Sequence, residues 1–261
     1  MATIRGLLTV LVLFLATVCL FPGQWLAIKF GWPIQRQLPF LWHQIAIRML
    51  DLRIHQVGSP ATDRPLLITA NHASWVDITA IGSLMPLSFI AKSEVGGWPI
   101  FGLLARLQRT VFVNRTRRTE TGKATNEIAE RMREGDAMVL FAEGTSSDGN
   151  MVLPFRSALL GAATKAQGED TKVWVQPLTI VYHSLHGMPM GRVWRPRVAW
   201  YGDMELGEHL WGVFTHGPMD VVAIWGEPVL AHSQTDRKQL SKHLEDEVRD
   251  RLIRSLRDGI A

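Results

Sequence analysis

The chain has very little cysteine, with Cys19 alone among 261 residues. A single cysteine excludes an intramolecular disulfide framework and is consistent with a reducing, cytoplasmic location. The sequence also lacks internal repeats and low-complexity linkers, so we expect one domain after the N-terminal segment. It lacks the G-x-S-x-G pattern of serine hydrolases, which argues against a lipid esterase.

Charged residues are absent between Arg5 and Lys29, and residues 7–21 are almost wholly apolar. This run satisfies the requirement of about 20 residues for a membrane-inserted helix. A cleaved signal peptide is the competing interpretation. It is disfavoured because the apolar run is long and no A-x-A-like cleavage site follows it. The sequence therefore predicts attachment to a membrane.

A second apolar segment, Pro39 to Ile54, contains Arg48 and Arg53 among its apolar residues, and the pair Pro22-Gly23 is expected to break the first segment. Two arrangements fit. One is a transmembrane helix followed by an interfacial helix, and the other is a two-helix hairpin that dips into one leaflet. In either case, residues 1–58 are predicted to anchor the chain, and residues 59–261 to form the remaining domain.

Strand-like and helix-like segments alternate after the membrane segment. This alternation predicts an α/β fold with a mainly parallel or mixed sheet flanked by helices. The expected strands are residues 66–70, 87–91, 110–113, 137–142, 172–181, 198–201 and 221–225. The expected helices are residues 76–84, 119–134, 157–167 and 236–257.

Two polar clusters directly follow apolar strand-like runs. The first holds His72 and Asp77, and the second holds Glu143, Gly144 and Thr145. Because open α/β sheets keep their sites at the ends of their strands, we expect the two clusters to converge at one sheet edge. A histidine held in one tautomer by a carboxylate can act as a general base. Backbone amides of the 143–145 turn are candidate donors to an oxyanion.

Five blocks of sequence, in order, resemble the lysophosphatidic acid acyltransferase family. The two clusters resemble its H-x4-D and F-P-E-G-T-R-S motifs. Lys92–Glu94 with Pro99–Gly102, then Val111–Arg115, then Val175–Ile180 resemble its K-x-E-L…P-x-x-G, F-I-x-R and V-P-V-x-I segments. The resemblance covers roughly residues 66 to 182.

The resemblance implies a membrane-bound O-acyltransferase that esterifies the hydroxyl of a lysolipid from an acyl thioester. His72 would be the general base, and Asp77 would accept a hydrogen bond from its other ring nitrogen. No cofactor is implied, because acyl carrier protein or coenzyme A would carry the acyl group as a co-substrate. The substrate-binding residues that the resemblance implies are Glu143, Gly144, Thr145, Lys92, Asn114, Arg115 and Arg156.

The chain departs from the F-P-E-G-T-R-S motif at two positions, with Ser146 in place of an arginine and Ala142 in place of a proline. A guanidinium binds phosphate through two parallel hydrogen bonds that serine cannot reproduce. The departure puts a phosphate-bearing acceptor in doubt, although Arg156 or Arg115 could compensate. Residues 141–150, 153–159, 185–192 and 199–204 resemble a bacterial branch, the lyso-ornithine lipid acyltransferases, whose acceptor has no phosphate.

Two alternatives to this branch stay open, a lysophosphatidic acid acyltransferase and a non-catalytic membrane lipid-binding protein. The expected location is a bacterial inner membrane, with the catalytic domain facing the cytoplasm. The chain is basic, with a pI near 9.5, and a patch of positive residues would suit anionic headgroups or acidic acyl carrier protein. The patch comprises Arg106, Arg109, Arg115, Arg117, Arg118 and Lys123.

Neither nucleic acid nor a metal is an expected partner. No helix-turn-helix, zinc-finger or RNP pattern accompanies the basic patch. His183 and His186 form an H-x2-H pair, but no third ligand lies at a diagnostic spacing, so we interpret the pair as loop residues rather than a metal site.

Overall fold

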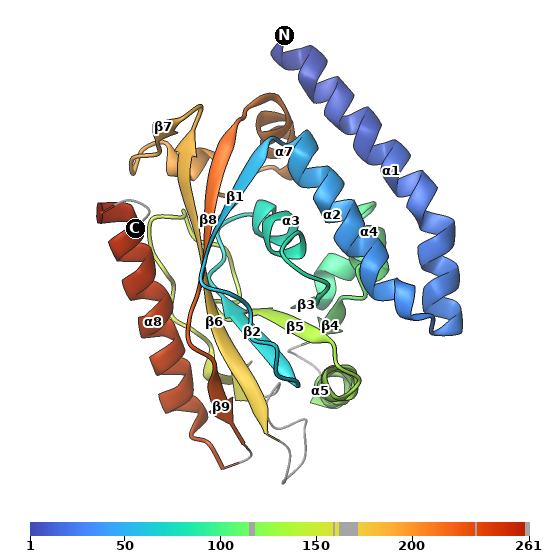
Figure 1. The fold of residues 1–261 in the computed structure, drawn as a ribbon, viewed down its shortest axis with the longest axis vertical. Coiled ribbons are helices and arrows are strands. Elements are labelled where there is room, and N and C mark those ends of the chain that lie inside the picture. Colours follow the sequence, from blue (N-terminus) through green and yellow to red (C-terminus); the bar gives the residue numbers. More distant parts are fainter. Residues whose placement is uncertain (115–117, 159, 162–171, 233, 259–261) are drawn as a thin grey trace.

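The N-terminal segment is a helical hairpin (Figure 1). The computed structural model describes residues 1–114, 118–158, 160–161, 172–232 and 234–258. Helix α1 (Ala2–Phe30) ends at Gly31, whose φ of 69° is readily adopted by glycine. After a short 3-10 turn, η1 (Pro33–Arg36), helix α2 (Gln37–Met49) returns alongside α1.

The break expected at Pro22-Gly23 does not occur, because α1 continues through Pro22. Proline removes one backbone donor from the helix, and side chains on either side of it tie α1 to its neighbours. Thr17 accepts a hydrogen bond from Trp42 of α2 at 2.9 Å, and Gln24 donates to the carbonyl of Leu107 at 2.6 Å. The turn therefore forms at Gly31.

Helix α1 is long and apolar enough to cross a membrane, and most of it is exposed. The choice between a spanning helix and a hairpin in one leaflet stays a prediction. The second apolar segment is helical only as far as Met49, and Leu52–Val57 form strand β1. This strand lies within residues 1–58 but pairs with β8 of the sheet, so the proposed boundary at residue 58 falls after the first strand.

The sheet is mixed, as predicted. Its order is β1-β8-β6-β2-β5-β3-β4, with the short strands β7 and β9 also paired to β6. Strands β2, β3, β4 and β5 run parallel to one another, and β6 is parallel to β2 but antiparallel to β8. The strand bounds are β1 Leu52–Val57, β2 Leu66–Ala70, β3 Ser88–Lys92, β4 Val111–Val113, β5 Ala137–Phe141, β6 Val173–Leu185, β7 Met188–Pro189, β8 Met219–Trp225 and β9 Val229–Ala231.

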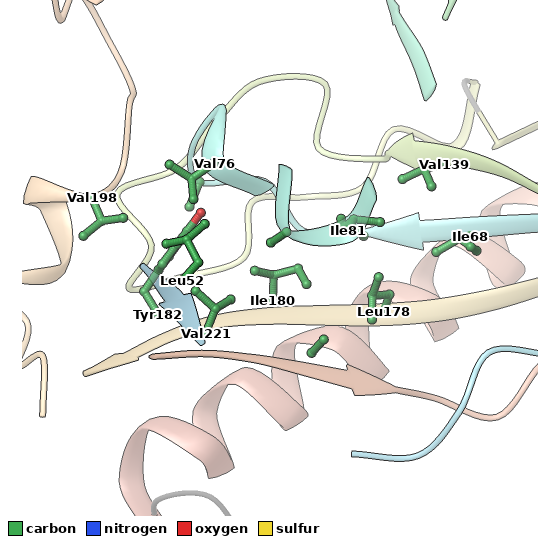
Figure 2. Packing of buried hydrophobic residues seen from close by; sticks show 14 of the residues in the cluster. Leu52, Ile68, Val76, Ile81, Val139, Leu178, Ile180, Tyr182, Val198 and Val221 are labelled. Carbon is green, nitrogen blue, oxygen red and sulfur yellow. The ribbon is translucent and has the colours of Figure 1, made fainter. Parts of the chain in front are cut away.

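Helices cover both faces of the sheet, and each face has its own apolar cluster. One cluster packs under α2, α3 and α7 and includes Ile68, Ile81 and Leu178 (Figure 2). The other packs under α5 and α8 and includes Ile128 and Leu244. The remaining helices are α3 Val76–Gly82, η2 Ser93–Gly97, α4 Phe101–Leu107, α5 Arg118–Arg133, η3 Arg195–Arg197, α7 Leu206–Thr215 and α8 Arg237–Asp258.

One predicted strand is wrong. Residues 198–201 follow η3 and form no strand. Val198 and Ala199 are buried in the first cluster and Tyr201 packs against it, while the N–H of Trp200 bonds to the carbonyl of Ala73 at 2.8 Å. A short apolar run looks the same in sequence whether it pairs with a strand or packs on a loop. The helix predicted over 157–167 lies largely outside the described residues.

Candidate active site

The two polar clusters meet at the edge of the sheet where the parallel strands end. His72 lies just after β2 and Glu143 just after β5, while Lys92 ends β3 and Asn114 follows β4. The N–H of His72 donates to Oε1 of Glu143 at 2.7 Å, across 71 residues of sequence. The predicted convergence is therefore confirmed for these two clusters.

His72 and Asp77 form the predicted pair. Nδ1 of His72 lies 2.8 Å from Oδ2 of Asp77, which also accepts from the N–H groups of Ala73 at 2.7 Å and Ser74 at 2.9 Å. A carboxylate can only accept, so Nδ1 carries a proton, and in the neutral imidazole Nε2 has the lone pair. The side chain of Asp77 is 1% exposed and that of His72 is 20% exposed, so a buried carboxylate orients an imidazole that is partly open to solvent.

Phe141, the last residue of β5, fixes the orientation of the His72 ring. The two rings stack with centroids 4.0 Å apart and an interplanar angle of 19°. Phe141 stacks in turn on the buried Phe89 of β3. The imidazole is therefore held by an aromatic face and by a carboxylate, which reduces the rotamer freedom that it would lose when substrate binds.

Glu143 is buried, and its carboxylate binds main chain on both sides. Oε1 accepts from the N–H of His72, and Oε2 accepts from the N–H of Leu153 at 2.9 Å. The side chain thus ties the loop that carries His72 to the loop after β5. Its predicted role in holding the acceptor stays a prediction. Burial raises the pKa of Glu143 to about 8, although the two backbone hydrogen bonds lower it.

We expect the stability of the fold to fall with rising pH because of Glu143. A group whose pKa is about 8 when folded and 4.5 when unfolded stabilises the fold below pH ~4.5. That contribution is lost as the pH rises through the folded value. The free energy of unfolding is measured by chemical denaturation at several pH values. Between pH ~4.5 and ~8 it should drop by a few kcal/mol more in the wild type than in Glu143→Gln. Glu227→Gln, at an exposed position, is the control, and parallel pH profiles for wild type and Glu143→Gln would contradict the prediction.

Tyr182 of β6 is a site residue that the sequence analysis missed. Its hydroxyl donates to Oδ1 of Asp77 at 2.5 Å, across 105 residues of sequence. The side chain is fully buried in the first apolar cluster, with its oxygen toward the segment that carries Val76 (Figure 2). Burial and the charge of Asp77 raise its pKa well above the usual range, so the phenol stays a donor. An aromatic residue in a buried strand gives no sequence signal of such a role.

Replacing Tyr182 with phenylalanine is expected to lower kcat by roughly tenfold, because Oδ1 of Asp77 would lose its hydrogen bond and the carboxylate its fixed orientation. The KM for the acceptor should stay close to the wild-type value. Rates are compared per folded enzyme, because partial unfolding would also lower the apparent kcat without changing KM. Steady-state kinetics with Tyr201→Phe, at the only other tyrosine, provide the matched control. Equal effects of the two substitutions would refute a positioning role.

The turn after Glu143 is tight. Gly144 has a φ of 70°, which favours glycine, and its N–H bonds to the carbonyl of Phe141 at 3.1 Å. This amide is therefore engaged within the turn, and the oxyanion role stays a prediction for the backbone amides of Glu143 and of the exposed Thr145. Arg156 donates from Nε to the carbonyl of Glu143 at 3.2 Å and is otherwise exposed.

Lys92 is exposed at the same edge, and Arg115 lies outside the described residues. Asn71, which precedes His72, is a further residue whose role appeared only in the structure. Its side chain bonds both the N–H and the carbonyl of Ile180, at 2.8 and 2.9 Å, and so joins the end of β2 to β6.

In the described part of the chain, no three His, Cys, Asp or Glu side chains form a group that could hold a metal.

Comparison with known proteins agrees with this geometry. The family model described as Acyltransferase matches residues 51–181, which is half of the chain and includes both polar clusters. The chain belongs to the acyltransferase family. The protein is therefore an enzyme, which excludes the non-catalytic alternative.

This acyltransferase is similar to two curated proteins named lyso-ornithine lipid O-acyltransferase. The Brucella abortus protein is 49% identical over 95% of this chain and 93% of its own length. The Rhizobium meliloti protein is 43% identical over 97% of this chain and 88% of its own length. The crystal structure of the 1-acyl-sn-glycerophosphate (LPA) acyltransferase PlsC from Thermotoga maritima matches with a TM-score of 0.59 and 25% identity, over 97% of each chain.

Proposed function

We propose that this acyltransferase transfers an acyl chain from an acyl thioester to the hydroxyl of lyso-ornithine lipid. The observation that carries the proposal is Ser146. Where the family motif has a phosphate-binding arginine, this chain has a serine whose hydroxyl donates to the carbonyl of Trp200 at 2.5 Å. The names of the two relatives support the same acceptor.

Ser146 is a poor ligand for a phosphate. Its hydroxyl proton is directed to a main-chain carbonyl, and serine carries no charge. Losing a charge-assisted hydrogen bond commonly costs about 1.5–3 kcal/mol, or roughly ten- to a hundredfold in affinity. An acceptor without a phosphate suffers no such loss, which favours lyso-ornithine lipid over lysophosphatidic acid.

In the proposed reaction, Nε2 of His72 removes the proton from the lipid hydroxyl as its oxygen attacks the thioester carbonyl carbon. A carbon–oxygen bond forms, and the carbonyl becomes a tetrahedral oxyanion. Asp77 stabilises the positive imidazolium that results. When the intermediate collapses, the carbon–sulfur bond breaks and the thiol leaves with the proton from His72. The acceptor supplies the nucleophile, so no covalent enzyme intermediate is required.

The cellular setting is part of the proposal. The apolar helix α1 and the lipid substrates of the relatives support a membrane-bound enzyme. We place it at a bacterial inner membrane with its catalytic domain in the cytoplasm, where acyl carrier protein is the expected donor and coenzyme A the alternative. The anchoring role of residues 1–58 belongs to the same proposal.

The acceptor can be tested directly. Membranes that contain the protein are given labelled acyl-acyl carrier protein with either lyso-ornithine lipid or lysophosphatidic acid, and kcat/KM is measured for each. We expect a clear preference for lyso-ornithine lipid. Ser146→Arg should raise the use of lysophosphatidic acid by roughly tenfold, whereas Ser146→Gln, which is long but uncharged, should not.

A preference of the wild type for lysophosphatidic acid would overturn the proposed acceptor and leave the acyltransferase assignment intact. Transfer to neither lipid, in a preparation that retains its donor-binding activity, would overturn the lysolipid class itself.

A further inference from the structure

A basic cavity of about 210 Å³ lies at the opposite edge of the sheet from His72. It is bordered by the segments that lead into β2, β3 and β5, whereas the active site follows the ends of those strands. The hairpin also contributes, through the junction of η1 and α2. The cavity is lined by Arg36, Gln37, Arg64, Met85, Pro86, Leu87, Ser88, Arg109, Gly135 and Asp136.

Positive charge exceeds negative charge beside this cavity. Three guanidinium groups surround the single buried carboxylate of Asp136: Nε of Arg36 lies 2.6 Å from it, Nη2 of Arg109 3.0 Å, and Nη2 of Arg131 2.8 Å. The side chains of Arg109 and Arg131 are only 10% and 11% exposed. Solvent therefore screens their mutual repulsion poorly, and an added anion would relieve it.

Guanidinium groups at the cavity also hold main-chain carbonyls. Nε of Arg36 is buried in its ion pair with Asp136, and Nη2 donates to the carbonyl of Glu134 at 2.8 Å. Arg64 is exposed and donates from Nη1 to the main-chain carbonyls of Ala61 and Asp63. Forked guanidinium donors of this kind match the oxygens of a phosphate group.

The position of the cavity indicates where such an anion comes from. Arg36 follows Trp32 by four residues, and Trp32 stacks on Phe30 at the end of the apolar helix α1, with both rings at least half exposed. Nζ of Lys29 lies over the Trp25 ring, 5.1 Å from its centroid. Exposed tryptophan and lysine at the end of an apolar helix are typical of the membrane–water interface, which places Arg36 at the level of lipid headgroups.

We propose that this cavity binds the phosphate of an anionic phospholipid headgroup, and that Arg36, Arg64 and Arg109 are its ligands. The bound lipid would fasten the turn of the hairpin to the sheet at the membrane surface. This site is separate from the acyl-acceptor site, so the proposal does not depend on which lysolipid is acylated.

The test uses the full chain in phosphatidylcholine nanodiscs with increasing phosphatidylglycerol, and native mass spectrometry to count the retained phosphatidylglycerol. Arg36→Gln and Arg64→Gln should each weaken its retention roughly tenfold. Arg254→Gln removes the same charge from an exposed position on α8 and should leave retention unchanged. Arg64→Gln carries little risk to folding because, among the described residues, Arg64 bonds to carbonyls of its own loop.

Unchanged retention in the Arg64 variant, or equal loss in the Arg254 control, would overturn the proposal. A second arm adds inorganic phosphate as a competitor. Displacement of phosphatidylglycerol only by a large excess of phosphate supports a lipid headgroup, while displacement at equal concentration would show a free-phosphate site and overturn the assignment to lipid.

Discussion

Replacing His72 with alanine is expected to abolish measurable acyl transfer, with kcat lowered by about 10²–10⁴-fold or more. In the proposed mechanism the ring is the base that takes the proton of the acceptor hydroxyl, and a hydroxyl does not attack a thioester unaided at neutral pH. The measurement is single-turnover ester formation with labelled donor and excess acceptor, which separates the chemical step from product release.

The fold should survive this substitution. The His72 side chain contributes one of four hydrogen bonds to Asp77, while its backbone N–H and carbonyl keep their bonds to Glu143 and Ser147. His243→Ala, at an exposed position on α8, is the matched control. Wild-type rates in the His72 variant would defeat the proposed mechanism.

Replacing Asp77 with asparagine is expected to lower kcat by on the order of 10²–10⁴-fold. The amide oxygen can still accept from Nδ1 of His72 and from the backbone of Ala73 and Ser74. Its NH2 group can donate to Tyr182, whose hydroxyl would turn from donor to acceptor. The hydrogen-bond network is thus kept, but the negative charge that stabilises the imidazolium is lost.

This substitution removes the negative charge of Asp77 and keeps the hydrogen bonds around it, so it measures the contribution of the charge alone. The thermal stability of Asp77→Asn should stay near that of the wild type, and Asp250→Asn, at an exposed position on α8, should change neither stability nor rate. A double variant with Tyr182→Phe should be no slower than Asp77→Asn alone, because the phenol acts through the carboxylate. Nearly wild-type turnover in Asp77→Asn would show that another group steers the histidine.

The pair of His72 and Asp77 could be predicted because it is local. Five residues separate the two side chains, and the chain between them begins at a strand end and enters a helix, so backbone geometry alone brings them together. Most of the sheet was predictable for a similar reason, since buried strands read as continuous apolar runs bounded by turn residues. The strand over 198–201 failed because apolar content does not reveal the partner of a segment.

The burial of the individual side chains could not be predicted from the sequence. The sequence predicts Glu143 as a substrate-binding residue in a turn motif. The fold instead buries its side chain between two backbone amides. Arg109 reads as part of an exposed basic patch, yet it is paired with Asp136 beside a cavity. In both cases the outcome depends on which distant segment covers the side chain, and packing decides that.

The sequence by itself indicated the reaction class, through the resemblance of its motifs to a known family. It also predicted the positions of most strands from their apolar runs, and the pairing of His72 with Asp77 from their spacing of five residues. Only the tertiary structure decided that Tyr182 completes the pair, that β1 joins the sheet beside β8, and that arginines from the hairpin and the catalytic domain surround one carboxylate. Those contacts join residues far apart in the chain, and they exist because burying two apolar clusters fixes which segments meet.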